Sequence, residues 1–211
     1  MHPIHRSLIL MACSLLAGAA QAHHPMDGAM PSTALQGLLS GLAHPVIAAD
    51  HLLFLLAAGT LAGLSQASVG RSAAALGAFA AAGMVGTALR VPGLAVPLLE
   101  PLIGITLLAT AFYLWQRRAP TVGAALLAAS AGAGFLHGQA YGEAVIGAEA
   151  GPVVWYLAGL LVVQCGLLLA TGLLVRRTAL PGVPRLRVLA RVLGIAAGAA
   201  GLWLTGSALF V

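Results

Sequence analysis

Residues 152–175 read PVVWYLAGLLVVQCGLLLATGLLV, a stretch without a charged side chain. At 1.5 Å per residue, a helix of this length is longer than the ~30 Å hydrocarbon core of a bilayer. Lipid offers the backbone no hydrogen-bonding partner, so a crossing segment of this kind forms a helix, which satisfies its own polar groups. The stretch therefore predicts a transmembrane helix. Trp155 and Tyr156, near its start, are typical of side chains that anchor a helix at the membrane interface.

Five other apolar stretches lie elsewhere in the chain. They are residues 33–64, 70–89, 97–115, 121–141 and 188–210. Of the 211 residues, 60% are hydrophobic and only 7% are charged, against about 25% charged in an ordinary soluble domain. We therefore expect an all-α, polytopic membrane protein in which a six-helix transmembrane bundle occupies residues 33–211.

The first 22 residues have the pattern of a cleaved signal peptide. His2, His5 and Arg6 precede an apolar run that ends at the small-x-small sequence Ala20-Gln21-Ala22. An uncleaved first helix is the weaker alternative, because the run is shorter than the ~20 residues that a span needs. We expect residues 1–22 to be removed and residues 23–32 to form a periplasmic N-terminal segment.

The arginines predict the topology. With the mature N-terminus outside, the connections at 65–70, 116–120 and 176–187 lie in the cytoplasm, and eight arginines fall at these ends. They are Arg71, Arg117, Arg118, Arg176, Arg177, Arg185, Arg187 and Arg191. In the mature chain only Arg90 falls outside, which is a strong positive-inside bias. We therefore expect a protein of the bacterial inner membrane whose mature N- and C-termini are both periplasmic. The arginines behind the net charge of +5 follow this topology, so the charge gives no reason to expect binding to nucleic acid.

All five acidic residues lie on the outer side of this topology or in the outer half of a span. They are Asp27, Asp50, Glu100, Glu143 and Glu149. Acidic residues contribute little to membrane orientation, so their placement has another cause. A negatively charged outer vestibule attracts cations.

Ionisable side chains form a first cluster inside the first apolar stretch: His44, Asp50 and His51. Such groups are costly within a membrane and usually functional, and imidazole with carboxylate suits divalent transition metals. Pro45 predicts a helix break, with His44 at the start of the span and His51 about two turns further inward, ~20° around the helix. The alternative is a set of buried polar groups that only stabilise the fold.

A second cluster lies near the outer end of the fourth stretch. His137 and Tyr141 are one helical turn apart and share a face, and Glu143 follows. The C-terminal end of a helix dipole favours a nearby cation. We predict His137 and Glu143 as ligands, with Glu149 in the following loop as a further one. The alternative is that Glu143 is a solvated residue at a helix end.

Three other residues are weaker candidates for metal binding. Glu100 opens the third span, where a carboxylate in a first helical turn also has an ordinary role in complementing the helix dipole. His23 and His24 follow the predicted cleavage site and can collect metal together with the new amine. A flexible tail with incidental histidines is the alternative.

A weak internal repeat relates the two clusters. Gly41-Leu42-Ala43-His44 aligns with Gly134-Phe135-Leu136-His137, and each histidine has an acid six residues later. Three spans separate the two segments, so the halves would have inverted orientations, as in many secondary transporters. The 27 glycines predict close helix packing through small-residue faces.

The two clusters resemble the signature motifs of the HupE/UreJ family of hydrogenase- and urease-associated nickel/cobalt permeases. His44, Asp50 and His51 match the first motif position for position. The second, Phe-His-Gly-x-Ala-His-Gly-x-Glu, is matched by Phe135, His137, Gly138, Ala140 and Gly142. Leu136 is an insertion, Tyr141 stands where the motif has its second histidine, and the acid is displaced to Glu143. The resemblance implies a six-helix bundle that imports nickel or cobalt.

We therefore expect a secondary transporter, and not an enzyme, whose substrate is Ni²⁺ or Co²⁺ and which has no permanently bound cofactor. The chain has no lysine and so no Walker motif to bind ATP. Its expected partners are the metal ion and membrane lipid; a homo-oligomer and a complex with metalloenzyme maturation proteins are both left open. The alternatives are an intramembrane zinc-dependent hydrolase, or a metal-relay accessory protein that performs no transport.

Overall fold

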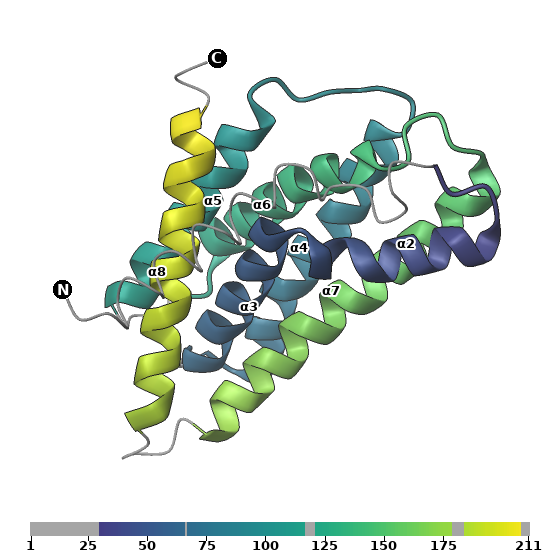
Figure 1. Ribbon diagram of the computed structural model, residues 1–211. Helices are drawn as coiled ribbons and strands as arrows, with labels where there is room; N and C mark the ends of the chain where they lie inside the picture. Colours follow the sequence, from purple (N-terminus) through teal and green to yellow (C-terminus); the bar gives the residue numbers. More distant parts are fainter. Residues whose placement is uncertain (1–29, 66, 117–120, 179–183, 208–211) are drawn as a thin grey trace, which may run out of the picture.

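The computed structural model describes residues 30–65, 67–116, 121–178 and 184–207, with side chains of the last segment described from residue 188. This part of the chain contains helices and no strand (Figure 1). The helices are α2 (Ala34–Ile47), α3 (Ala49–Leu64), α4 (Val69–Arg90), α5 (Leu99–Gln116), α6 (Ala124–Glu143), α7 (Ala150–Thr178) and α8 (Pro184–Ser207). The expected all-α class is confirmed for the described residues.

The first apolar stretch forms two helices, α2 and α3. Thr33 starts α2 with a capping box: its hydroxyl accepts from the Gln36 amide, and the Gln36 side chain accepts from the Thr33 amide. The stretch then bends by 74° between α2 and α3. The bend lies at Ala48, whose extended backbone (φ −80°, ψ 105°) ends one helix and precedes the next.

The break expected at Pro45 is therefore displaced by three residues. Pro45 lies in the last turn of α2, and His44 is at the end of a helix instead of at its start. Proline has no N–H, so the helix loses the hydrogen bond that residue 45 would donate. The next turn still closes, because the Ala48 amide donates to the His44 carbonyl at 3.1 Å. The chain leaves helical geometry only after that bond.

Close packing of glycine against backbone joins α2 and α3 to α7. A side chain at Gly37 would meet Pro152, one at Gly41 would meet Tyr156, and one at Gly63 would meet Gly172. Residue numbers rise together on both sides, so the first span and α7 run parallel, as Figure 1 shows. Small residues permit this approach where lipid provides no hydrophobic driving force.

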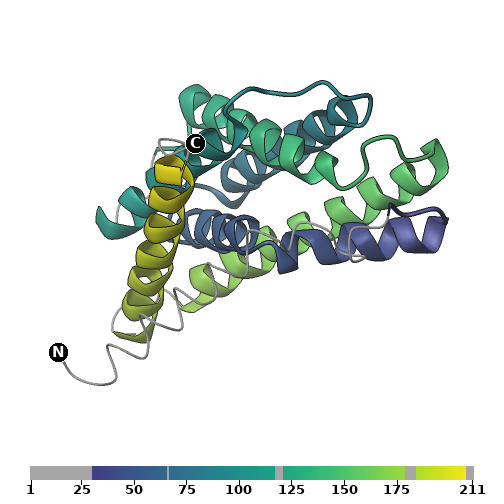
Figure 2. The same ribbon diagram turned by 45° about the horizontal axis from the view of Figure 1, so that its top comes forward.

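The same kind of packing makes a second parallel pair, α4 with α6. Gly134 faces the backbone of Phe79, and Gly138 faces that of Gly83. In contrast, α5 and α8 are antiparallel, and Gly104 lies against Gly201. Figure 2 shows the α4–α6 pair on one side of the molecule, the first span with α7 on the other, and α5 with α8 across one end.

Four described helices are long and apolar enough to span a membrane by themselves: α4, α5, α7 and residues 188–207 of α8. The bent pair α2 and α3 makes a fifth if it counts as one span. The remaining expected span, the fourth apolar stretch, forms α6. This helix is not apolar enough to be counted, because its second half carries His137, Gln139, Tyr141 and Glu143. The chain is thus a multi-pass membrane protein, and the second half of α6 is buried and polar.

Candidate functional site

The three histidines predicted within the spans lie together in the structure. The exposed fractions of His44, His51 and His137 are 1%, 0% and 0%. The ring centroids of His44 and His51 are 5.9 Å apart, and those of His51 and His137 are 5.0 Å apart. These residues come from α2, α3 and α6, so the bend at Ala48 and the packing of α6 jointly assemble the cluster.

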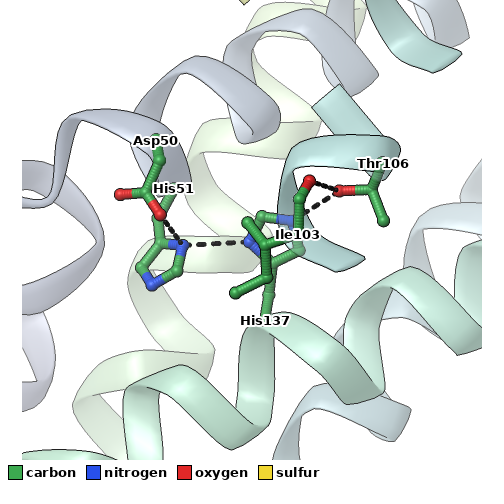
Figure 3. A network of polar contacts seen from close by, with 5 residues as sticks. All are labelled: Asp50, His51, Ile103, Thr106 and His137. Carbon is green, nitrogen blue, oxygen red and sulfur yellow. Dashed lines mark hydrogen bonds and ion pairs between the residues drawn. The ribbon is translucent and has the colours of Figure 1, made fainter. Parts of the chain in front are cut away.

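Two short contacts join His51 to its neighbours (Figure 3). Its Nδ1 lies 3.0 Å from Nδ1 of His137 and 3.3 Å from Oδ2 of Asp50. The Asp50 side chain is 13% exposed. A carboxylate and two imidazoles therefore meet around one nitrogen.

Thr106 of α5 approaches His137 from the opposite side. Its Oγ1 lies 3.0 Å from Nε2 of His137 and 2.7 Å from the carbonyl oxygen of Ile103 (Figure 3). The carbonyl can only accept, so the single hydroxyl proton of Thr106 points to Ile103. The hydroxyl oxygen then accepts from His137, whose proton lies on Nε2 and whose lone pair lies on Nδ1.

The tautomer of His51 follows from that of His137. Nδ1 of His137 is an acceptor, so the 3.0 Å contact requires a proton on Nδ1 of His51. The same proton faces the carboxylate of Asp50. Neutral His51 therefore carries its lone pair on Nε2. The donors therefore follow one another from His51 through His137 and Thr106 to the backbone of α5, and the Asp50 carboxylate accepts from the first of them.

His44 has an equivalent arrangement with Tyr156 of α7. The Tyr156 hydroxyl donates to the Tyr141 carbonyl at 2.7 Å and lies 2.8 Å from Nδ1 of His44. Since its one proton is used on the carbonyl, the hydroxyl accepts from His44, whose lone pair is then on Nε2. Tyr156 is fully buried, and the expectation that it anchors α7 at the interface is wrong. Trp155, which is 48% exposed, is free to serve that role.

Aromatic rings complete the walls of the cluster. The Tyr141 ring centroid is 4.3 Å from that of His51 and 5.3 Å from that of His44. Phe54 lies 4.3 Å from His137 and stacks on Phe79. Tyr141 shares the site with His137, as their spacing on α6 predicts. Its buried hydroxyl has no hydrogen-bond partner among the described residues.

The remaining acidic candidates lie on the surface of the described structure. Glu143 forms an ion pair with Arg90 at 2.8 Å, and its side chain is 45% exposed. Glu100, in the first turn of α5, and Glu149, just before α7, are also exposed. These three residues do not join the histidine cluster. His23 and His24 lie outside the described residues.

In the described part of the chain, no three side chains of His, Cys, Asp or Glu are arranged so that they could hold a metal ion. The hydrogen bonds give the reason. His51 and His137 are hydrogen-bonded to each other, His137 is also hydrogen-bonded to the Thr106 hydroxyl, and His44 is hydrogen-bonded to the Tyr156 hydroxyl. A cation shared by His51 and His137 has to replace the proton between them.

A cavity of about 280 Å³ begins beside this cluster. Phe54 and Thr106 line one part of it, and Ser65, Ser72 and Tyr113 line another. The last three lie at the ends of α3, α4 and α5 that the arginines assign to the cytoplasm. The cavity therefore extends from the histidine cluster toward the predicted cytoplasmic side, and its walls are mainly apolar.

The comparison with family models gives the relationship of the chain to known proteins. The model described as "HupE / UreJ protein" matches residues 11–204. The chain belongs to the HupE/UreJ family. The match covers all four residues of the HupE/UreJ chain that meet in the structure: His44, Asp50, His51 and His137. Neither the curated proteins nor the solved structures contain a match.

Tyr156, Thr106 and Phe54 are site residues that sequence reasoning missed in this HupE/UreJ protein. Tyr156 was assigned to the interface, and Thr106 and Phe54 lie in apolar helices with no motif around them. A hydroxyl group within a span is the one available signal, since such groups need a hydrogen-bond partner in lipid. That signal also marks threonines that bond only to their own helix, such as Thr60 and Thr110.

Proposed function

We propose that this protein imports a divalent transition metal, Ni²⁺ or Co²⁺, across the inner membrane. One observation carries the proposal: three fully buried imidazoles and a carboxylate meet between membrane helices, and a cavity leads from them toward the cytoplasmic side. Imidazole nitrogen suits these ions, and ionisable groups within a bundle mark ion pathways. Family membership supports the same function.

The contacts suggest a sequence of steps. Glu100, Glu143 and Glu149 attract the cation to the outer surface, and His44 receives it at the end of α2. The ion then takes the place of the proton between His51 and His137: this proton moves from Nδ1 to Nε2 of His51, so the ring stays neutral and its Nδ1 can bind the ion, while Asp50 balances the charge. Release follows past Thr106 into the cavity between α3, α4, α5 and α6.

The helix pairs suggest how the protein could open to each side of the membrane in turn. In the inverted repeat, the first span corresponds to α6, α4 to α7, and α5 to α8. The repeat then exchanges the two parallel pairs, first span with α7 and α6 with α4, and maps the antiparallel α5–α8 pair onto itself. Glycine contacts agree, because Gly41 meets Gly159 as Gly134 meets Gly83. Rocking of one parallel pair against the other would expose the cluster to each side in turn.

Nickel and cobalt are proposed from the family and from the ligand type together. The affinities of first-row divalent metals for a given set of imidazole and carboxylate ligands follow a general order that depends on the metals. The ligand types therefore do not tell Ni²⁺ from Co²⁺. Both ions, with Zn²⁺ as a competitor, belong in the test.

Transport by the purified protein in proteoliposomes tests the proposal. We expect saturable uptake of radioactive Ni²⁺ or Co²⁺, and its loss in His51→Ala and His137→Ala. Gly132→Ala is the control, because this glycine of α6 is exposed and nothing lies within 4 Å of an added side chain. Stoichiometric binding without uptake would exclude a permease and favour the relay or hydrolase alternatives.

A further inference from the structure

We propose that Thr106 and Tyr156 are positioning residues that determine which nitrogen of His137 and His44 is available to the metal. This inference rests on the proposed function. Neither residue has to touch the ion. Each holds the protonated side of a histidine, so that the other nitrogen keeps its lone pair.

The chemical need arises from the neutral imidazole ring. It carries one proton on either of two nitrogens, and only the other nitrogen can bind a metal. Histidines that ligate metals usually donate their remaining N–H to a fixed acceptor, which sets both tautomer and ring orientation. Lipid offers no acceptor for this N–H, and a fixed acceptor from the protein holds the ring in one orientation.

Thr106 is suited to this role because its own proton has a fixed destination. The bond to the Ile103 carbonyl, within α5, leaves the hydroxyl oxygen as an acceptor for Nε2 of His137. Nδ1 of His137 therefore keeps its lone pair on the side of His51, 3.0 Å away. Loss of the hydroxyl would leave a buried N–H without an acceptor and remove the preference between the two nitrogens.

Tyr156 performs the same task with a carbonyl from another helix. Its hydroxyl joins α7 to the Tyr141 carbonyl of α6 and to His44 of α2. The tautomer of His44 is thus coupled to the contact between the two parallel helix pairs. A movement that separates α6 from α7 would free the Tyr156 proton and change what His44 can bind.

Thr106→Val and Thr106→Ser separate positioning from packing. We expect metal affinity, measured by calorimetry in detergent, to fall about 10- to 100-fold in Thr106→Val, the usual effect of losing a residue that orients a ligand. Thr106→Ser should bind metal with an affinity within about threefold of wild type, because it keeps the hydroxyl group whose loss weakens binding in Thr106→Val. Thr110→Val is the matched control: it lines the same cavity, and its hydroxyl bonds to the Thr106 carbonyl of its own helix.

Tyr156→Phe, with Tyr113→Phe as its control, tests the other arm in the same assay. Tyr113 lies on α5 at the far part of the cavity and is 37% exposed. We expect weaker binding only for Tyr156→Phe. The inference would be overturned if Thr106→Val and Thr106→Ser lost metal affinity equally. It would also be overturned if Thr106→Val or Tyr156→Phe kept wild-type affinity.

A readout that needs no transport separates this inference from the proposed function. Nitrogen-15 chemical shifts of labelled histidines distinguish protonated from unprotonated ring nitrogens in the metal-free protein. We expect His137 protonated on Nε2 and His44 on Nδ1 in the wild type, with mixed tautomers in Thr106→Val and Tyr156→Phe. Unchanged tautomers in both variants would overturn the positioning role even if uptake is observed. Failure of uptake with the expected tautomers would reject only the permease.

Discussion

Among the described residues, Asp50 is the carboxylate in contact with the histidine cluster, and its Oδ2 lies 3.3 Å from Nδ1 of His51. Asparagine at this position can still accept that bond while it removes the negative charge. A divalent cation between two neutral imidazoles needs a nearby negative charge to offset its desolvation. The role of charge can therefore be separated from that of geometry by a single substitution.

We predict that Asp50→Asn weakens metal binding by about 10- to 100-fold, as is typical when a group behind a ligand is altered. Calorimetric titration of the purified protein with Ni²⁺ and Co²⁺ measures this loss. Unchanged affinity, in a protein that loses all binding on His51→Ala, would show that the carboxylate charge has no part in the site.

Glu143→Gln provides the comparison, because it removes the same charge from a surface ion pair with Arg90. An exposed pair of this kind contributes about 0–1 kcal/mol to stability. Glu143 does not join the histidine cluster. We therefore expect the affinity of the site for metal to stay within about threefold of wild type, a change in binding free energy of less than about 1 kcal/mol. A loss as large as that of Asp50→Asn would place Glu143 among the ligands.

At the scale of elements, glycines determine which helices pair. Gly134 and Gly132 lie on the same helix, two residues apart, and differ only in surroundings. A side chain on Gly134 would collide with the backbone of Phe79 in α4, whereas nothing lies within 4 Å of one on Gly132. Backbone atoms cannot rotate away as a flexible side chain can.

We predict that Gly134→Ala destabilises the protein by roughly 1–3 kcal/mol, the cost of overpacking a tight contact. Gly132→Ala should be neutral or stabilising by up to about 1 kcal/mol, because alanine favours the helix. Thermal unfolding in detergent, followed by size-exclusion chromatography, compares the two. Equal melting temperatures would mean that α4 and α6 are not held at this distance.

The bend between α2 and α3 shows how far a local rule reaches. Proline at position 45 indicates a break in the first stretch, and the break exists. Its position at Ala48 depends on whether one more turn can close after proline, which the hydrogen bond from Ala48 to His44 decides. The result places His44, which is buried, at the end of a helix instead of at the start of one.

At the scale of the whole molecule, the cavity gives the proposed transport route a direction. Ser130 of α6 lines it, and serine to cysteine is a small change. In a background without the native Cys13 and Cys165, we predict that Ser130→Cys reacts with a cationic, membrane-impermeant thiol reagent added from the cytoplasmic side only. Inside-out and right-side-out vesicles make the comparison.

Val162→Cys is the control for that experiment, since Val162 is a 63% exposed side chain of α7. We expect it to react only with a lipid-soluble maleimide. Reaction of Ser130→Cys from the periplasmic side, or only with the lipid-soluble reagent, would contradict an inward-facing route filled with water.

The outer acids predict an electrostatic effect on the rate of uptake. Replacing Glu100, Glu143 and Glu149 together by glutamine should raise the KM for metal at low ionic strength. The difference should disappear near 0.5 M salt, because exposed charges are screened beyond roughly 4 Å there. Initial uptake rates at several salt concentrations measure it. A difference that persists at high salt would indicate direct coordination.

The sequence by itself determined the membrane class, the family and the residue types of the candidate site. Hydropathy and motif spacing are properties of consecutive residues, so the apolar stretches and the two motifs, one with His44, Asp50 and His51 and the other with His137, are readable along the chain. The tertiary structure decided the partners of these histidines. Tyr156 is 112 residues from His44, and Thr106 is 31 residues from His137. Contacts of this range depend on which helices pack together and on the bend at Ala48, and no local pattern encodes either.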